Sequence, residues 1–309
     1  TAYYGRLCGI FRPHLGNRQS DASDGKYHER ISAVLSSVEK GHGAVLLRTE
    51  IRDEEMPFPI RSGLKAKSSL ITFLQYEDGD LPVLHNISFT AHPNETVAIM
   101  GETGCGKTSL INLIPRFYEP TEGQIRIDGI PVEQLKLYDL RKQIGLATQD
   151  VLLYSDTIEG NIAYGDDSIK MNEVVKFARY SAAADFISKM PEGYDTLVGE
   201  RGVGLSGGQK QRISLARALA IRPSVLILDD TTSAVDMETE KQIQQSLREL
   251  DFPCTKIVIA QRISTTKTAD KIIVLQNGYI EEMGTHEELM EKKGYYYELV
   301  KLQTGVDEL

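Results

Sequence analysis

One eight-residue segment constrains the fold of this chain more than any other part of its sequence. It consists of Gly101, Glu102, Thr103, Gly104, Cys105, Gly106, Lys107 and Thr108, and Ser109 follows it. The pattern G-x-x-x-x-G-K-[ST] is typical of a loop whose glycines let backbone N–H groups close around a polyphosphate. An apolar run precedes the loop, and the amphipathic stretch SLINLIPRF follows it. We therefore predict a strand, a phosphate-binding loop and a helix that begins at Lys107. A glycine-rich turn that matches by chance is the alternative.

A second motif lies at the end of a predicted buried strand. The segment VLILDD at 225–230 is apolar until it ends in two carboxylates, and ligand sites of parallel sheets open at the carboxyl ends of strands. We predict that Lys107 neutralises the phosphates and that Thr108 and Asp229 bind Mg²⁺. Asp230 then stands where a water-activating carboxylate would be placed. The alternative for the two acids is an ordinary solvated strand end.

Runs of strand character alternate with helical stretches from residue 70 onward. The predicted strands cover 70–74, 83–89, 95–100, 123–128, 225–228, 255–260 and 271–276. This alternation predicts an α/β fold in which a mostly parallel sheet is covered by helices on both faces. Residues 1–66 form a weakly patterned lead-in, and the stretch from about 150 to 215 is interpreted as an inserted helical subdomain.

Composition excludes several classes of protein. The net charge is −9, from 44 acidic and 35 basic residues, which argues against a broad nucleic-acid surface. Cys8, Cys105 and Cys254 are too few and too scattered for a disulfide framework or a zinc site, so we expect a reducing compartment. No run approaches the ~18–20 apolar residues of a membrane-spanning helix. Because the sequence starts at Thr1 without an initiating Met, we also expect it to be part of a longer polypeptide.

The most specific motif is Leu205-Ser206-Gly207-Gly208-Gln209, which is followed by KQRISLARALA. Ser206 and Gln209 have the spacing of a capping box, which would leave free N–H groups at a helix N-terminus. With this motif, in its place between the loop and the VLILDD strand, the sequence resembles the nucleotide-binding domain of ABC transporters. A capping box with flexible glycines and no ligand is the alternative.

The resemblance, which is strong from about residue 70 to 303, implies the fold and the ligands. It implies a P-loop NTPase core over residues 67–309, with an antiparallel β subdomain besides the parallel sheet and the helical insert. ATP and Mg²⁺ are the implied ligands. A second ATPase domain is the implied partner, in a head-to-tail dimer where each ATP lies between one subunit's glycine-rich loop and the other subunit's LSGGQ motif.

Three further positions match the family one by one. Tyr76 lies where the family places an aromatic ring stacked on adenine, although the spacing around it is slightly irregular. Gln149, in LATQD, matches a glutamine that joins Mg²⁺ and the attacking water to the helical subdomain. Asp236, in SAVD, matches an aspartate that communicates between the two ATP sites.

Several segments resemble exporters rather than importers. They are VGERG at 198–202, the C-terminal stretch IIVLQNGYIEEMGTHEEL, and HERISAVLSSVEK with IRDEEMPFP upstream, which resemble the connector to the last membrane helix. The resemblance therefore implies transmembrane domains as partners and a location on the cytoplasmic face of the cell membrane. For residues 1–25 the sequence suggests no role.

Two residues depart from the family pattern in one site. The family has Glu where this chain has Asp230, and His where it has Gln261. A carboxylate that is one methylene shorter retreats by roughly 1 Å, and a glutamine cannot carry a proton or a positive charge. We hypothesise a heterodimeric exporter in which this chain's own ATP site is weakened and its LSGGQ motif completes the site of a partner that retains Glu and His. The alternatives are an ordinary ATPase of a homodimeric exporter, a regulatory ATP-binding module with little turnover, and a soluble ABC ATPase acting on DNA or ribosomes.

Overall fold

The computed structural model describes residues 70–78, 81–166, 168–199, 202 and 204–305, which all belong to one compact unit. For residues 70–82 the description covers the backbone alone. The predicted lead-in over 1–66, the connector segments within it, and Glu200 and Arg201 of VGERG lie outside the described residues. Within the described part, no helix has the length and apolar character needed to cross a membrane.

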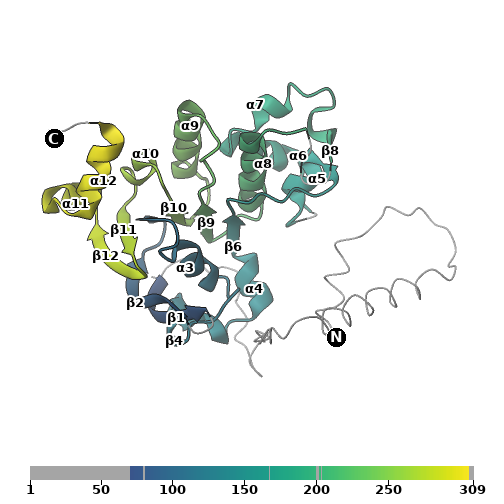
Figure 1. Ribbon diagram of the computed structural model, residues 1–309. Helices are drawn as coiled ribbons and strands as arrows, with labels where there is room; N and C mark the ends of the chain where they lie inside the picture. The colour runs from purple at the N-terminus through teal and green to yellow at the C-terminus, as the bar shows by residue number, and fades with distance from the viewer. Residues whose placement is uncertain (1–69, 79–80, 167, 200–201, 203, 306–309) are drawn as a thin grey trace, which may run out of the picture. The chain divides into compact units, whose positions relative to one another are not determined.

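A six-stranded sheet forms the centre of the unit (Figure 1). Its strands, in spatial order, are β12 (Tyr279–Gly284), β11 (Lys271–Gln276), β3 (Thr96–Gly101), β10 (Thr255–Ile259), β9 (Val225–Asp229) and β6 (Ile144–Ala147). All neighbours are parallel except β12, which pairs antiparallel with β11. The predicted mostly parallel sheet is confirmed, and its order brings the carboxyl ends of β3, β10, β9 and β6 to one edge.

The strands of the central sheet carry apolar side chains on both faces, because other parts of the unit pack against both faces of the sheet. In β3, Val97 and Ile99 join one buried cluster, whereas Ala98 and Met100 face another. The same alternation runs along β9, where Leu226 and Leu228 pack toward the helical side. A strand buried on both faces has no polar face to show, so it is recognised in the sequence as a continuous apolar run.

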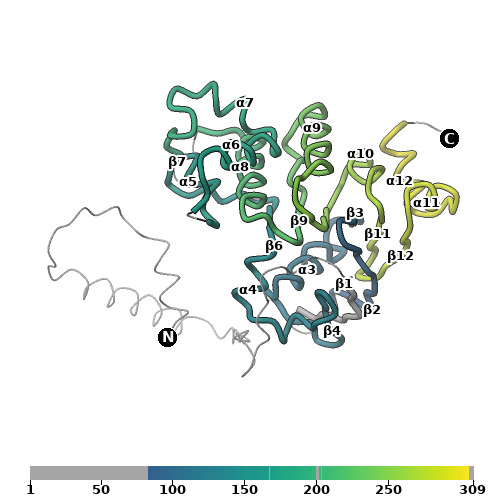
Figure 2. The backbone as a smooth tube through the Cα atoms, turned by 180° about the vertical axis from the view of Figure 1, so that it is seen from behind, coloured from purple at the N-terminus to yellow at the C-terminus, as the bar shows by residue number. Residues whose placement is uncertain are grey.

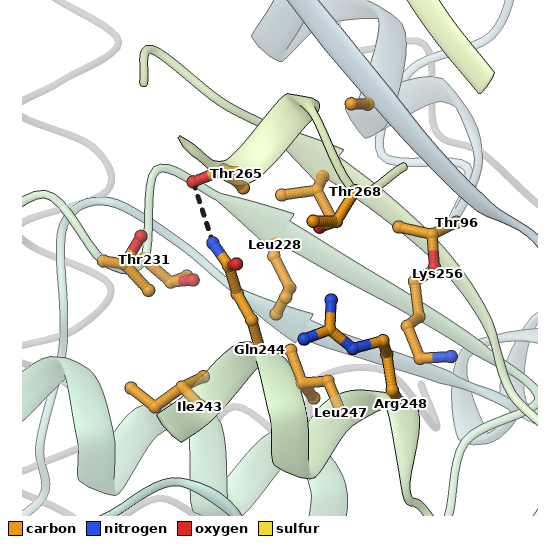
Figure 3. A pocket seen from close by; sticks show the side chains of 13 residues that line it. Thr96, Leu228, Thr231, Ile243, Gln244, Leu247, Arg248, Lys256, Thr265 and Thr268 are labelled. Atoms are coloured by element: carbon orange, nitrogen blue, oxygen red, sulfur yellow. Dashed lines mark hydrogen bonds between the residues drawn. The ribbon is translucent and has the colours of Figure 1, made fainter. Parts of the chain in front are cut away.

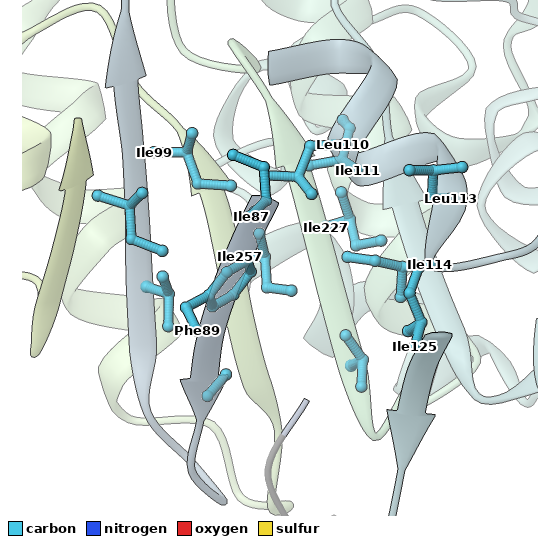
Figure 4. Packing of buried hydrophobic residues seen from close by; sticks show 14 of the residues in the cluster. Ile87, Phe89, Ile99, Leu110, Ile111, Leu113, Ile114, Ile125, Ile227 and Ile257 are labelled. Carbon is cyan, nitrogen blue, oxygen red and sulfur yellow. The ribbon is translucent and has the colours of Figure 1, made fainter. Parts of the chain in front are cut away.

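A second, antiparallel sheet lies on one side of the central sheet. The helix that follows the glycine-rich loop packs between the two sheets. The strand order of the second sheet is β2 (Leu81–Ala91), β1 (Leu70–Asp78), β4 (Glu122–Ile127) and β5 (Ile130–Pro131). Helix α3 (Lys107–Leu113) packs between the two sheets, with Leu110 and Ile111 against Ile87 and Ile227 (Figure 4). The antiparallel subdomain implied by the resemblance is therefore present.

Helix α3 is shorter than the stretch SLINLIPRF suggested. It ends at Leu113, with Ile114 as its C-cap before the proline at 115. Proline has no N–H for the helical ladder and disfavours helical geometry in the residue before it. Arg116 then takes a left-handed φ of 53°, so the backbone does not continue the direction of α3.

The helical subdomain lies at the β6 end of the sheet (Figures 1 and 2). It comprises β7 (Asp156–Thr157), α5 (Ile158–Ala163), α6 (Met171–Tyr180), α7 (Ala184–Ile187), η3 (Gly193–Asp195), β8 (Leu197–Val198) and α8 (Gly207–Ala220). Phe177, Ile162 and Ile213 are fully buried where α5, α6 and α8 meet. Helix α8 continues beyond residue 215 and packs against β6, so it links the subdomain to the sheet.

The remaining elements complete the unit around the sheet. They are η2 (Val132–Gln134), α4 (Leu137–Lys142), α9 (Met237–Arg248), α10 (Ile263–Thr266), α11 (His286–Lys292) and α12 (Tyr295–Thr304). Helices α11 and α12 cover the outer face of β3 and β11 through a cluster that contains Leu289, Tyr296 and Val300.

Candidate nucleotide site

The glycine-rich loop runs from the end of β3 into the first turn of α3. Gly101, Gly104 and Gly106 have positive φ angles of 150°, 84° and 99°. A Cβ atom on Gly101 would lie 2.2 Å from the carbonyl oxygen of Leu275, and one on Gly106 would lie 2.6 Å from Cδ2 of Leu84. Only glycine fits both the conformation and the space at these two positions. Helix α3 begins at Lys107, as the pattern predicted.

The ammonium group of Lys107 folds back over this loop. Its Nζ donates hydrogen bonds to the carbonyl oxygens of Gly101 at 2.8 Å and Glu102 at 2.7 Å. Cys105 is buried, whereas Glu102, Thr103 and Gly104 are exposed. The loop therefore offers a positive charge next to exposed backbone, an arrangement that suits an anionic ligand.

Thr108 and Asp229 bring a hydroxyl and a carboxylate together beside the loop. Oγ1 of Thr108 donates to Oδ2 of Asp229 at 3.3 Å. Burial raises the pKa of Asp229, while the bond from Thr108 and the charge of Lys107 oppose this shift. A buried carboxylate that is costly to ionise by itself is stabilised by a bound cation, so the pair fits Mg²⁺ chemically.

A metal ion here would find few ligands from the protein. Among the residues that the structure describes, no three His, Cys, Asp or Glu side chains gather into a metal-binding cluster. Mg²⁺ typically takes one or two protein oxygens and fills its octahedron with phosphate oxygens and water. The hydroxyl of Thr108 and the carboxylate of Asp229 match that donor set.

Asp230 and Gln261, the two departures from the family pattern, contact each other directly. Nε2 of Gln261 donates a hydrogen bond to Oδ2 of Asp230 at 2.9 Å. Asp230 has a left-handed φ of 48°, which aspartate tolerates better than most residues. Burial raises the pKa of Asp230, and the neighbouring charge of Asp229 raises it further.

The LSGGQ motif forms the start of α8. Ser206 is the N-cap: its Oγ accepts from the backbone N–H of Gln209 at 3.3 Å, and Oε1 of Gln209 accepts from the N–H of Ser206 at 2.9 Å. The predicted capping box is thus confirmed. Gly207 and Gly208 are the first two helical residues, whose N–H groups have no partner within a helix. The exposed Ser206 and Gly207 therefore border a helix N-terminus that can face an anion.

Gln211, which the sequence analysis did not single out, ties α8 to the segment after β9. This buried side chain donates to Oγ of Ser233 at 3.2 Å and to the carbonyl oxygen of Asp230 at 3.5 Å. Its Oε1 accepts from the N–H of Ala234 at 3.2 Å. One amide side chain therefore joins the helix of the LSGGQ motif to the Asp230 segment.

Asp236 and Gln149 occupy positions at the borders of the site. Asp236 is the N-cap of α9 and accepts from the N–H groups of Glu238 at 3.1 Å and Thr239 at 2.9 Å. These bonds, with that of Thr239 foremost, lower the pKa of Asp236. Gln149 is exposed two residues after β6, whose end pairs with β9 through Ala147 and Leu228.

Tyr76 is placed by its backbone alone. It lies in β1 and pairs with Leu84 of β2, next to the loop, since Leu84 also packs against Gly106. The register of β1 and β2 shifts on both sides of Tyr76, which agrees with the irregular spacing seen in the sequence. Its side chain lies outside the described residues, so stacking on adenine stays a prediction.

The structure thus groups Lys107, Thr108, Asp229, Asp230 and Gln261 at one edge of the sheet. A separate cavity of about 50 Å³ lies on the α9 side, lined in part by Thr96, Gln244, Lys256 and Thr265 (Figure 3). Gln244 donates to Thr265 across its mouth at 3.2 Å. None of the grouped residues lines this cavity.

Known proteins share both the sequence and the fold. A family model described as "ABC transporter" matches residues 84–233. An ATP-dependent lipid A-core flippase of Syntrophus aciditrophicus is 47% identical over 258 residues, which cover 84% of this chain and 42% of that protein. A putative multidrug export ATP-binding/permease protein of Staphylococcus aureus is 50% identical over 229 residues, covering 74% of this chain and 40% of that protein.

A solved structure of an ABC exporter has a similar fold. The structure of a bacterial Atm1-family ABC exporter with ATP bound superposes with a TM-score of 0.80 at 36% identity, covering 92% of this chain and 48% of that one. The chain therefore spans less than half the length of the relatives that it matches. Residues 84–233 are an ABC transporter domain, and the chain is similar in sequence and fold to part of known ABC exporters.

Proposed function

We propose that this chain binds Mg-ATP at its glycine-rich loop and acts as the motor domain of an ABC exporter. The observation that carries the proposal is the placement of an ammonium, a hydroxyl and a carboxylate, from Lys107, Thr108 and Asp229, at the end of β3 and β9. The β- and γ-phosphates would take the place of the Gly101 and Glu102 carbonyls as acceptors for Lys107. Thr108 and Asp229 would hold Mg²⁺, which supplies charge neutralisation when phosphate charge develops.

Equilibrium binding of ATP to purified variants tests this first step. Lys107→Ala removes charge-assisted hydrogen bonds to phosphate, so ATP affinity should fall by about tenfold or more. Lys241→Ala, at an exposed position on α9, controls for the loss of one positive charge. Equal affinities of the Lys107→Ala variant and the wild-type chain would contradict the proposed placement of the phosphates.

We infer that Ser206, Gly207, Gly208 and Gln209 serve a second ATP site, in a head-to-tail dimer with another ABC ATPase domain. The support is the exposed, capped start of α8, which is bonded through Gln211 to the segment that ends at Asp236. In that dimer, Asp236 would lie between the two sites. Ser206→Ala should lower turnover at the partner's site, whereas Lys107→Ala should leave that turnover largely intact; the opposite pattern would rule this arrangement out.

This chain's own ATP site is proposed to be weak in hydrolysis, with a partner that retains Glu and His. The carboxylate of Asp230 is already engaged by Gln261, and neither residue supplies what Glu and His supply in the family. A regulatory module that holds ATP with little turnover is the second candidate, and the same hydrogen bond favours it. ATPase assays of this chain with and without its partner distinguish the two candidates. Turnover that appears only with the partner supports the function as a motor domain rather than as a regulatory module.

The membrane partner is proposed to be a pair of transmembrane domains, with this chain at the cytoplasmic face. Exposed apolar side chains on the helical subdomain support a docking surface: Leu152 is 55% and Tyr164 is 46% exposed, and the ring of Tyr164 stacks on Tyr154 with centroids 4.1 Å apart. Substituting Glu for both Leu152 and Tyr164 should reduce recovery of the chain with the membrane part of the exporter. ATP affinity of the isolated chain should not change.

A further inference from the structure

The C-terminal helix α12 reaches two sides of the nucleotide site. At its first residue, the hydroxyl of Tyr295 donates to Oε1 of Glu102 in the glycine-rich loop at 3.1 Å. In its last turn, Gln303 contacts the segment that carries Gln261. Eight residues of α-helix separate these contacts by ~12 Å. One rigid element therefore touches both the phosphate loop and the loop of Gln261.

Helix α12 is firmly anchored between these two contacts. Tyr296 is fully buried and Val300 is 3% exposed, in the cluster that includes Ala98 and Met100 of β3. The hydroxyl of Tyr296 also lies 2.8 Å from Nδ1 of His286 in α11. Because β3 leads directly into the glycine-rich loop, the position of α12 is tied to the strand that places that loop.

The amide of Gln303 makes two backbone hydrogen bonds on either side of Arg262. Its Nε2 donates to the carbonyl oxygen of Gln261 at 2.8 Å, and its Oε1 accepts from the N–H of Ile263 at 3.0 Å. The N–H of Ile263 can only donate, so the two bonds fix which amide atom points to which partner. An exposed side chain thus holds the backbone at both ends of a three-residue segment.

The opposite side of this segment is held by the side chain of Arg262. The guanidinium of Arg262 pairs with Glu240 at 2.6 Å and donates to the carbonyl oxygen of Ser233 at 3.1 Å. Glu240 is 2% exposed and also accepts from Gln244 at 3.2 Å. Arg262 is held from one side, and the two hydrogen bonds of Gln303 hold the backbone of Gln261 and Ile263 from the other.

We propose that Gln303 is a positioning residue that aims the side chain of Gln261 at its target. This inference rests on the proposed function and adds to it that Gln261 donates a hydrogen bond to the γ-phosphate of bound ATP. Nε2 of Gln261 donates one N–H to Asp230. It has a second N–H, which the same held backbone would present to the γ-phosphate of bound ATP. Gln303 acts through the backbone of Gln261 and touches no reacting atom.

Amide hydrogen exchange of the nucleotide-free chain tests the contact itself. Gln303→Met removes both bonds at similar side-chain length, so the Ile263 amide should exchange about fivefold faster, the effect of one hydrogen bond. Gln303→Glu keeps an acceptor for that amide and should preserve its protection. Gln242→Met, the same substitution at an exposed glutamine of α9, should leave Ile263 unchanged. Equal exchange in Gln303→Met and wild type would overturn the proposal.

Affinities for ATP and ADP test the action through Gln261. Gln303→Met should weaken ATP binding by about two- to tenfold and leave ADP binding unchanged, because only ATP has the γ-phosphate. In a Gln261→Ala background, Gln303→Met should have no further effect on the ATP-to-ADP ratio. Additive effects of the two substitutions, or an equal loss for ADP, would show a merely structural role and overturn the proposal.

The two readouts separate this inference from the proposed function. If the wild-type chain binds neither ATP nor ADP, the proposed function fails, and the exchange rate of Ile263 still decides whether Gln303 holds the segment. If the wild-type chain binds ATP and the double-substitution cycle shows no coupling, the proposed function stands and the positioning role is wrong.

Discussion

Gln261 donates a 2.9 Å hydrogen bond to the carboxylate of Asp230, so the two residues that depart from the family pattern satisfy each other. A carboxylate that acts on water needs a free oxygen aimed at that water. Here Oδ2 is occupied by an amide that cannot take up a proton. The contact supports the proposal that this site holds nucleotide better than it hydrolyses it.

The glycine-rich loop should tolerate a side chain at one glycine and reject it at another. Gly101→Ala places a Cβ atom 2.2 Å from the carbonyl oxygen of Leu275, and we expect it to cost about 3 kcal/mol of unfolding free energy. At Gly104 no atom lies within 4 Å of the added Cβ, so Gly104→Ala should cost only ~1 kcal/mol, for its positive φ. Urea unfolding of the two variants measures the difference. Similar midpoints would mean that the loop does not pack on β11 as described.

The stability of the nucleotide-free chain should fall as pH rises above the ordinary aspartate range. The pKa values of Asp229 and Asp230 are raised, first by burial, so the folded state keeps protons that the unfolded state has lost above pH 3.8. Stability falls with pH wherever the folded state binds more protons. This loss should extend upward through the raised folded pKa values and then level off.

Asp230→Asn should reduce that pH dependence. The variant should be more stable than wild type at neutral pH and gain nothing below pH 3.8, where the unfolded carboxyl is protonated as well. Asp185→Asn, on the exposed face of α7, controls for removing one negative charge outside this pair. Parallel stability profiles of Asp230→Asn and wild type from pH 4 to 8 would refute the burial argument.

The two glycines of the LSGGQ motif should respond differently to alanine. Alanine favours a helix over glycine by up to ~1 kcal/mol, and Gly207→Ala meets its nearest atom, Cβ of Ala234, at an ordinary 3.5 Å. Gly208→Ala would bring its Cβ within 2.7 Å of the carbonyl oxygen of Ala234. We expect Gly207→Ala to be neutral or stabilising and Gly208→Ala to destabilise by about 1–3 kcal/mol. Thermal unfolding compares them, and the reverse order would contradict the packing of α8 on the Ser233–Asp236 segment.

Much of the fold and of the site followed from local patterns in the sequence. Continuous apolar runs such as 225–228 identified strands buried on both faces, and the spacing of Ser206 and Gln209 identified the start of α8. The contacts of Gln211 and Gln303 left no such pattern, because each amide bonds to backbone groups 19 or more residues away. The direct bond between Asp230 and Gln261 was equally hidden, since it depends on how β9 and β10 end side by side.

The proposed weak hydrolysis at this chain's own ATP site is tested most directly by ATP turnover after Asp230 and Gln261 are replaced together. Asp230→Glu with Gln261→His, assayed in the complex with the partner domain disabled in its own ATP site, should raise turnover at this site by up to ~10²-fold, with ATP affinity little changed. Each single substitution should achieve less than the pair, because the two side chains contact each other. Unchanged turnover in the double variant would contradict the claim that these two residues hold this site below full hydrolytic strength.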